Sequence, residues 1–336
     1  MTNYISIGRT WIRDNALRLA WTGSGFSINF YGTGAAAVIS SSTDNPIYLG
    51  YLNVYVDSAA LPVSTVKIDR KGLCLYTLAD RLPPGAHTLT VKKRNEAAYG
   101  GSATLGIHDI SVIDGCPLEP PPAPERLIEF VGDSITSGFG NMVSDPGELD
   151  YATDTCDGTR TYAMLAADAL GAAASVLSRS GIRFCREPGK AASESMINHY
   201  TKISNLTGNA DPWNFARPAD AVVVNLGTND NGTAGDFTFF TSEAAVLLSM
   251  IRANNPGALI VWCYGIMGEA PRISGPIKAA VTDMTAAGDD KVFYLSMKPI
   301  DPAREGLGVH GHPTVFTHIK NSFVLAEFLA EKMRTV

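Results

Sequence analysis

Four short blocks in the second half of the chain carry side chains that can do chemistry together, and the first contains a serine. Ser134 follows a short apolar run and lies in a glycine-flanked segment, residues 132–138. A serine on such a turn has the setting of a nucleophile whose own amide can face an oxyanion. The segment is not the Gly-x-Ser-x-Gly elbow of other hydrolases, because Thr136 replaces the second glycine, and it lacks the lysine of a phosphate-binding loop.

The other three blocks supply groups that would complement such a serine. Gly181 follows an apolar run, Asn229 lies in the segment 227–230 that follows another, and His312 precedes the last helical pattern. The carboxyl ends of parallel strands meet at one edge of a sheet, where ligands bind. A glycine amide, an asparagine amide and a histidine at that edge would add oxyanion donors and a general base.

The elements that must position these residues follow from the apolar pattern after residue 125. Short, nearly continuous apolar runs alternate with helical patterns, which is typical of a parallel sheet covered on both faces. We predict a doubly wound α/β domain with a parallel sheet of about five strands. The predicted strands are residues 127–131, 174–178, 221–226, 259–264 and 292–296, and the predicted helices are residues 159–170, 236–252, 276–287 and 314–333.

The first half of the chain has a different pattern. Apolar and polar residues alternate with period two, as in the runs 26–30 and 52–56, and turn-forming residues separate the runs. This predicts an all-β sandwich of jelly-roll type over residues 1–115. Residues 116–124 are rich in proline, which removes backbone donors. We therefore expect them to form a stiff linker, without regular strand or helix, to an α/β domain over residues 125–336.

Composition narrows the class of protein. The 336 residues are 45% hydrophobic and 18% charged, which is typical of a globular protein. The net charge of −6 argues against a nucleic-acid binder or a binder of anionic membranes. No run approaches the roughly 18 apolar residues of a membrane span, and the first residues lack the pattern of a signal peptide. We expect a cytoplasmic protein, or a secreted or periplasmic one if a signal peptide was removed. The five cysteines contain no C-x-x-C pair and predict ordinary thiols.

Together, these blocks resemble the SGNH, or GDSL-type, hydrolase superfamily. The residues Gly132-Asp133-Ser134, Gly181, Gly227-Thr228-Asn229-Asp230 and His312-Pro313-Thr314 occur in that superfamily's order. The N-terminal half is similar to carbohydrate esterase family 2, which joins a jelly roll to an SGNH domain and removes acetyl groups from plant polysaccharides. The segments that carry this second resemblance are residues 7–10, 21–26, 56–57 and 91–96.

The resemblance implies a role for each block. Ser134 would be the nucleophile that forms an acyl-enzyme, and His312 the general base. The Ser134 amide, the Gly181 amide and the Asn229 side chain would hold the oxyanion. The substrate would be an O-acetylated hemicellulose, such as an acetyl-xylan or acetyl-mannan oligosaccharide, and no metal or organic cofactor would be needed. A lipase or thioesterase of the same superfamily, or an inactive carbohydrate-binding protein, are the alternatives.

One position departs from the superfamily pattern. An aspartate normally stands three residues before the histidine, where this chain has Val309. Without that carboxylate the imidazole lacks its usual orienting group. A backbone carbonyl can partly replace the carboxylate in this role. Carbohydrate esterase family 2, which the chain resembles, is known for Ser-His dyads, so we predict a dyad of Ser134 and His312. His310 is the less favoured alternative base, because it lacks the Pro-Thr that follows His312.

Aromatic side chains near the predicted strands are candidates for stacking against sugar rings. Trp213 precedes the third strand of the α/β domain, and Trp262 and Tyr264 lie on the fourth. Packing in the protein core is an equally good interpretation of each.

Overall fold

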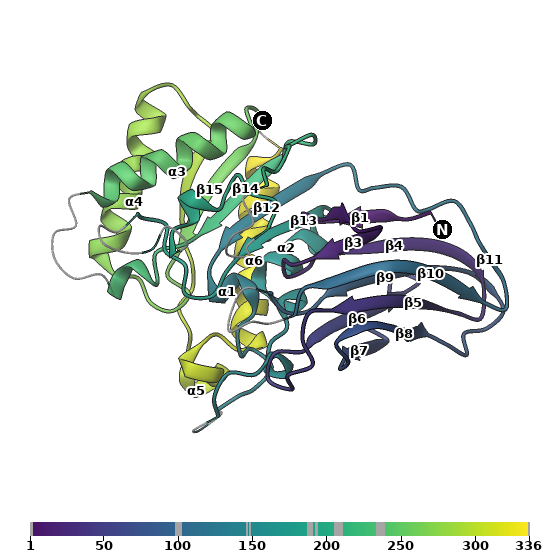
Figure 1. Cartoon of the computed structure of the whole chain (residues 1–336). Helices are drawn as coiled ribbons and strands as arrows, with labels where there is room; N and C mark the ends of the chain where they lie inside the picture. The colour runs from purple at the N-terminus through teal and green to yellow at the C-terminus, as the bar shows by residue number, and fades with distance from the viewer. Residues whose placement is uncertain are drawn as a thin grey trace.

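The computed structural model describes residues 3–97, 103–145, 147, 149–186, 191, 194–204, 211–232 and 239–334. It consists of a β-sandwich and an α/β domain that lie against each other, as Figure 1 shows in purple to blue and in teal to yellow. Both predicted fold classes are confirmed.

The sandwich is made of two antiparallel sheets whose inner faces form one apolar core. Phe26, Ile28 and Phe30 are completely buried there, as the period-two pattern predicts. One sheet has the order β1 (Ile5–Ile7), β4 (Gly25–Gly32), β9 (Gly85–Lys93), β6 (Gly50–Val56) and β7 (Ser64–Ile68). The other has the order β2 (Trp11–Arg13), β3 (Ala16–Leu19), β10 (Leu105–Ile113), β5 (Gly34–Ser41) and β8 (Gly72–Ala79).

The proline-rich segment is not irregular over its whole length, so the expectation that it holds no regular strand is wrong at its start. Cys116 and Pro117 form a short strand, β11, that pairs antiparallel with Tyr31 and Phe30 of β4. A proline is tolerated in this short strand because β11 lies at an edge of the sheet, where a missing backbone N–H leaves no neighbouring strand unpaired. The chain then returns from the far end of the sandwich to the α/β domain (Figure 1).

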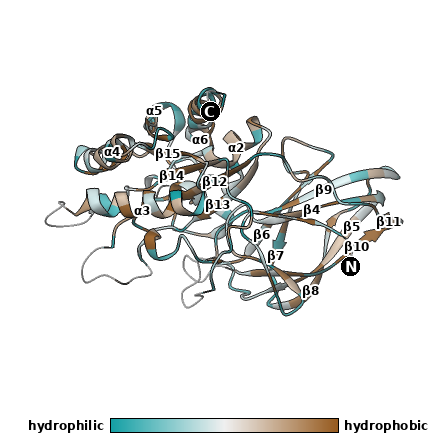
Figure 2. Cartoon of the chain, turned by 90° about the horizontal axis from the view of Figure 1, so that it is seen from above, coloured by the Kyte–Doolittle hydropathy of each residue, from teal (hydrophilic) through white to brown (hydrophobic). Residues whose placement is uncertain are grey.

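The α/β domain has three layers, with a five-stranded parallel sheet between two layers of helices. Its strand order is β13 (Ala173–Ser178), β12 (Leu127–Gly132), β14 (Ala221–Asn225), β15 (Leu259–Tyr264) and β16 (Val292–Ser296). Helices α2 (Tyr162–Ala169) and α6 (Val315–Lys332) pack on one face, and α3 (Phe240–Asn254) and α4 (Pro271–Ala286) on the other. Figure 2 shows α6 and α3 on opposite sides of the strands. The chain adds β13 on one side of β12 and then adds β14 on the other side. The place where the strand order reverses, between β12 and β14, is where ligands bind in such sheets.

The predicted strands of this sheet agree with the structure to within one residue, but the helices differ more. Helix α4 begins at Pro271 and continues through Pro276, which was predicted to be its first residue. Ile273 and Ile277 are both completely buried, so the apolar face extends across the second proline and keeps the helix intact. A 3-10 turn, Gly158–Arg160, replaces the first turn predicted for α2. The predicted start of α3, residue 236, lies outside the described residues.

Polar side chains join the two domains inside the interface. Arg9 of the sandwich is completely buried and donates to the Glu129 carboxylate of β12 at 3.0 Å. Asn53 of β6 donates to the Asp157 carboxylate at 3.0 Å. Buried polar groups must be paired to be tolerated, so these contacts fix one relative placement of the domains. None of the described helices is both long and apolar enough to cross a lipid bilayer.

Candidate active site

Ser134 is placed by the sharp turn at the end of β12. It is the first residue of the short helix α1 (Ser134–Ser137), and the Asp133 carboxylate caps this helix by accepting the Ile135 amide at 3.0 Å. Gly132 has no room for a side chain, because a Cβ atom there would overlap Thr136. The serine is therefore held at the strand's end, where it is only 7% exposed.

His312 reaches this serine from the other end of the domain. Its Nε2 lies 2.8 Å from the Ser134 Oγ, and its Nδ1 lies 3.0 Å from the Val309 carbonyl oxygen. A carbonyl only accepts hydrogen bonds, so the proton of the neutral ring is on Nδ1 and Nε2 is free to accept the serine proton. Burial lowers the pKa of His312 to about 4, which keeps the ring neutral near pH 7.

The turn that carries His312 also separates it from His310. His310 has a left-handed backbone, with φ of 53°, and its ring is half exposed and lies 3.0 Å from the Asp150 carboxylate. The structure therefore brings His312, and not His310, to the serine. His318 is buried on α6, where it accepts the Tyr162 amide.

Two of the three predicted oxyanion donors, Gly181 and Asn229, lie in the loops after β13 and β14. Gly181 has φ of 79°, and no atom approaches within 4 Å of the position a Cβ would take. The Asn229 amide nitrogen donates to the Ile182 carbonyl at 2.9 Å and, at a longer 3.3 Å, to the Asp133 carboxylate. Asn229 thus links the loop after β13 to the turn that holds Ser134.

Two buried aspartates hold these loops. The Asp230 carboxylate accepts the amides of Phe184 and Cys185, each at 3.1 Å, and so ties the loop after β14 to the loop after β13. Burial raises the pKa of Asp230 to about 6 and that of Asp133 to about 7. Both carboxylates thus hold the backbone of the site, Asp230 between the two loops and Asp133 at the start of α1.

A row of aromatic rings extends from the histidine, and sequence reasoning missed it. The Phe139 ring lies 4.4 Å from the His312 ring, Tyr151 stacks on Phe139 at 4.8 Å, and Tyr48 lies 6.3 Å from Tyr151. Tyr48 belongs to the sandwich, and both tyrosines are partly exposed. No sequence block contains these residues, so only their proximity in the folded chain reveals them.

The three aromatic residues that were candidates for stacking against sugars lie elsewhere. Trp262 and Tyr264 are 0% and 2% exposed in the core of the sheet, so of the two interpretations core packing describes both. Trp262 instead donates to the Leu226 carbonyl at 3.1 Å and packs edge-on against Phe184. Trp213 precedes β14 at the opposite edge of the sheet from Ser134, where Arg9 lies over its ring.

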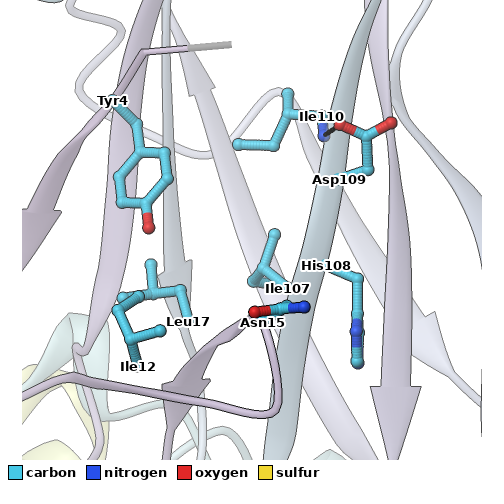
Figure 3. A pocket seen from close by; sticks show the side chains of 8 residues that line it. All are labelled: Tyr4, Ile12, Asn15, Leu17, Ile107, His108, Asp109 and Ile110. Carbon is cyan, nitrogen blue, oxygen red and sulfur yellow. Dashed lines mark hydrogen bonds between the residues drawn. The ribbon is translucent and has the colours of Figure 1, made fainter. Parts of the chain in front are cut away.

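Cavities lie away from the serine, both between the domains and on the sandwich. A cavity of about 680 Å³ lies between the domains and is lined by Trp213, Lys92 and Asp168 among others. A smaller one of about 110 Å³ lies on the sandwich, where Tyr4 faces Ile107 and Ile110 (Figure 3). Within the described part of the chain, no three His, Cys, Asp or Glu side chains are arranged to hold a metal ion.

Comparison with known families matches both domains. Residues 6–122 match the family described as carbohydrate esterase 2 N-terminal, and residues 130–314 match the GDSL-like lipase/acylhydrolase family.

Individual proteins are similar over most of the chain. Cellulase/esterase CelE of Acetivibrio thermocellus is 32% identical over 309 residues, which are 90% of this chain and 36% of that protein. This chain therefore spans about a third of the length of CelE. The acetylxylan esterase/glucomannan deacetylase of Cellvibrio japonicus is 28% identical over 262 residues, which are 74% of this chain and 70% of that protein.

A solved structure is similar over the whole chain. A family two carbohydrate esterase from Clostridium thermocellum, in complex with cellohexaose, superimposes with a TM-score of 0.89 at 28% identity. The match covers 99% of this chain and all of that one.

Proposed function

The chain belongs to carbohydrate esterase family 2 and is a carboxylic ester hydrolase, and we propose that it removes O-acetyl groups from hemicellulose oligosaccharides through an acyl-enzyme on Ser134. The observation that carries the proposal is the 2.8 Å contact between the Ser134 Oγ and the His312 Nε2. That contact pairs a nucleophile with a base of the right tautomer.

The first half-reaction forms the acyl-enzyme. The Ser134 Oγ attacks the acetyl carbonyl carbon while His312 Nε2 takes the hydroxyl proton. The amides of Ser134 and Gly181 and the Asn229 side chain donate hydrogen bonds to the negatively charged carbonyl oxygen. Asn229 exchanges its longer bond, the 3.3 Å contact with the Asp133 carboxylate, for this one. When the tetrahedral intermediate collapses, the ester C–O bond breaks and the sugar oxygen takes the proton from His312.

The second half-reaction returns the enzyme to its starting state. His312 removes a proton from water, the hydroxide attacks the acyl carbonyl, and the Ser134 oxygen leaves as it regains the proton. Free acetic acid is the product. Each oxyanion donor typically contributes about 10²- to 10³-fold to the rate.

The proposed catalytic pair is a dyad. The Val309 carbonyl accepts from Nδ1 and so fixes the tautomer and the ring orientation, which are two tasks of the aspartate in a triad. The carbonyl dipole also favours the imidazolium that forms during the reaction, more weakly than a full charge would.

An acetylated polysaccharide as substrate is supported by the relatives and by the aromatic row. One relative is named for acetylxylan and glucomannan, and a similar structure holds cellohexaose. Tyr151 and Tyr48 offer partly exposed rings near His312, and aromatic faces bind the apolar faces of sugars.

The test is acetate release from acetylated xylan and acetylated glucomannan by the wild type, Ser134→Ala and His312→Ala. The rate of acetate release should be at least about 10³-fold lower in both variants than in the wild type. 4-Nitrophenyl acetate and octanoate, assayed in parallel, separate an acetylesterase from a lipase by chain-length preference. Acetate release by Ser134→Ala at the wild-type rate would remove the serine from the mechanism. A wild type that binds glycan but hydrolyses no ester would be a binding protein.

A further inference from the structure

A buried segment of the sandwich packs against the α/β domain. Residues 93–96 begin with the last residue of β9, and Lys93, Asn95 and Glu96 in this segment are 0%, 1% and 3% exposed. Arg94 donates through Nε to the Cys156 carbonyl at 2.7 Å, and the Gly158 amide donates to the Arg94 carbonyl at 2.8 Å. The segment therefore anchors the loop that precedes α2.

Glu96, the last residue of this segment, contacts the loop after β13. Its two carboxylate oxygens accept the Ser180 amide at 3.0 and 3.2 Å, and one of them also accepts the Ser180 hydroxyl. Both partners are on the residue that immediately precedes Gly181. A carboxylate from one domain thus fixes the backbone and side chain of Ser180 in the other.

We propose that Glu96 is a positioning residue for the esterase reaction: it holds Ser180 so that the Gly181 amide points at the carbonyl oxygen of the substrate. This inference rests on the proposed function. It gives the sandwich a part in catalysis, because Glu96 acts on the Gly181 amide through its contact with Ser180.

The geometry of the loop explains why such a support is needed. The direction of the Gly181 N–H depends on the peptide plane that Ser180 and Gly181 share. Gly181 has φ of 79°, which favours glycine, and no atom lies within 4 Å of its would-be Cβ. Side-chain packing at Gly181 therefore does not restrain this plane. The turn around it is closed by the Ile182 amide, which donates to the Arg179 carbonyl at 3.2 Å, and Glu96 holds Ser180, the residue of this turn that precedes Gly181.

The charges around Glu96 keep its carboxylate able to accept these bonds. Burial raises the pKa of Glu96 to about 6, while the Ser180 hydrogen bonds and the charges of Arg179 and Lys93 favour the ionised form. Asp133 and Cys156 are the other titratable groups that interact with it. Above pH 7 the carboxylate is mostly ionised and presents two acceptors to Ser180.

The kinetic test separates positioning from general stability with a matched control. Glu96→Ala should lower kcat about 10- to 100-fold and leave KM for 4-nitrophenyl acetate within about twofold of the wild-type value. A misdirected Gly181 amide stabilises the transition state less, while binding of the substrate is unaffected. Glu129→Gln is the control, because Glu129 is also a buried carboxylate in an interdomain contact, with Arg9. Its kcat should stay within about twofold of the wild type even if its melting temperature falls.

Two milder variants serve if Glu96→Ala does not fold. Glu96→Gln can still accept the Ser180 amide and can donate to the Ser180 hydroxyl, so it should retain most of the kcat. Ser180→Ala removes only the hydroxyl contact and should give an intermediate loss. Wild-type kcat in folded Glu96→Ala and Ser180→Ala, or an equal kcat loss in Glu129→Gln, would overturn the proposal.

A readout that does not depend on turnover distinguishes this proposal from the proposed function. In protein labelled with ¹⁵N-glycine, the Gly181 amide signal is assigned by its loss in Gly181→Ala. Glu96→Ala should shift that signal and speed its hydrogen exchange, and Glu129→Gln should leave both unchanged. An unshifted Gly181 signal in Glu96→Ala overturns the positioning role. An inactive wild type with a Gly181 signal that depends on Glu96 rejects only the proposed function.

Discussion

The Nδ1 atom of His312 lies 3.0 Å from the carbonyl oxygen of Val309, the residue at which the superfamily pattern would place an aspartate. The orienting group therefore comes from the backbone of the same turn that carries the histidine. Because the side chain at 309 is not needed for this contact, the position is filled by an apolar residue that packs against Gly140.

Restoring an acid at position 309 should not improve the enzyme. The Val309 side chain is completely buried against Gly140, so an aspartate there places an unpaired carboxyl group in an apolar site. We expect Val309→Asp to lose about 1–3 kcal/mol of unfolding free energy and to gain nothing in kcat. Thermal unfolding and 4-nitrophenyl acetate kinetics check this. A tenfold higher kcat would mean that the aspartate replaces the carbonyl as the partner of Nδ1.

Gly140 should be intolerant of any side chain. It has φ of 58°, and a Cβ there would overlap the Val309 side chain, which would displace the turn leading to His312. We expect Gly140→Ala to lower both kcat and the melting temperature. Gly147→Ala is the matched control, since Gly147 has φ of 62° but nothing within 4 Å of its would-be Cβ. Equal losses in the two variants would show that backbone strain alone is responsible.

The His312 ring should titrate well below the usual range of histidine. Burial lowers its pKa to about 4 from an ordinary value of 6.5, so the neutral form that accepts the serine proton persists at mildly acidic pH. We expect the NMR signal of its Cε1 proton, assigned by its absence in His312→Ala, to titrate with a midpoint between about 4 and 5. A midpoint at or above 6.5 would contradict the role of burial.

Buried His318 should make stability depend on pH. Burial, and to a lesser extent the charge of His312, lowers the pKa of His318 to about 3 from 6.5. Between these values the unfolded chain binds a proton that the folded chain does not, so stability is complete above pH 6.5 and is lost as the pH falls.

The comparison with His318→Asn isolates this effect, because asparagine offers an acceptor to the Tyr162 amide and does not titrate. Relative to this variant, the wild type should lose about 1.4 kcal/mol of unfolding free energy per pH unit below 6.5. Urea unfolding at several pH values measures the difference. A constant difference from pH 7 to pH 4 would contradict it.

Much of the fold followed from local pattern. The period-two runs predicted the sandwich, and the parallel strands were placed to within one residue, because strand pairing at two buried faces needs continuous apolar runs. Helix starts were less predictable. Pro276 lies inside α4 because the buried face formed with Ile273 and Ile277 outweighs the lost backbone hydrogen bond.

The sequence by itself determined which residues can meet at the active site. Ser134, Gly181 and Asn229 each lie within four residues after a strand, and parallel strands place such residues at one edge. Only the tertiary structure decided what supports them: the Val309 carbonyl on His312, the Glu96 carboxylate on Ser180, and the burial of Trp262. The contact between Glu96 and Ser180 joins residues 84 positions apart in different domains, and no local pattern of side chains encodes it. Such contacts depend on how complete domains pack, because burial and hydrogen-bond geometry exist only once both surfaces have formed.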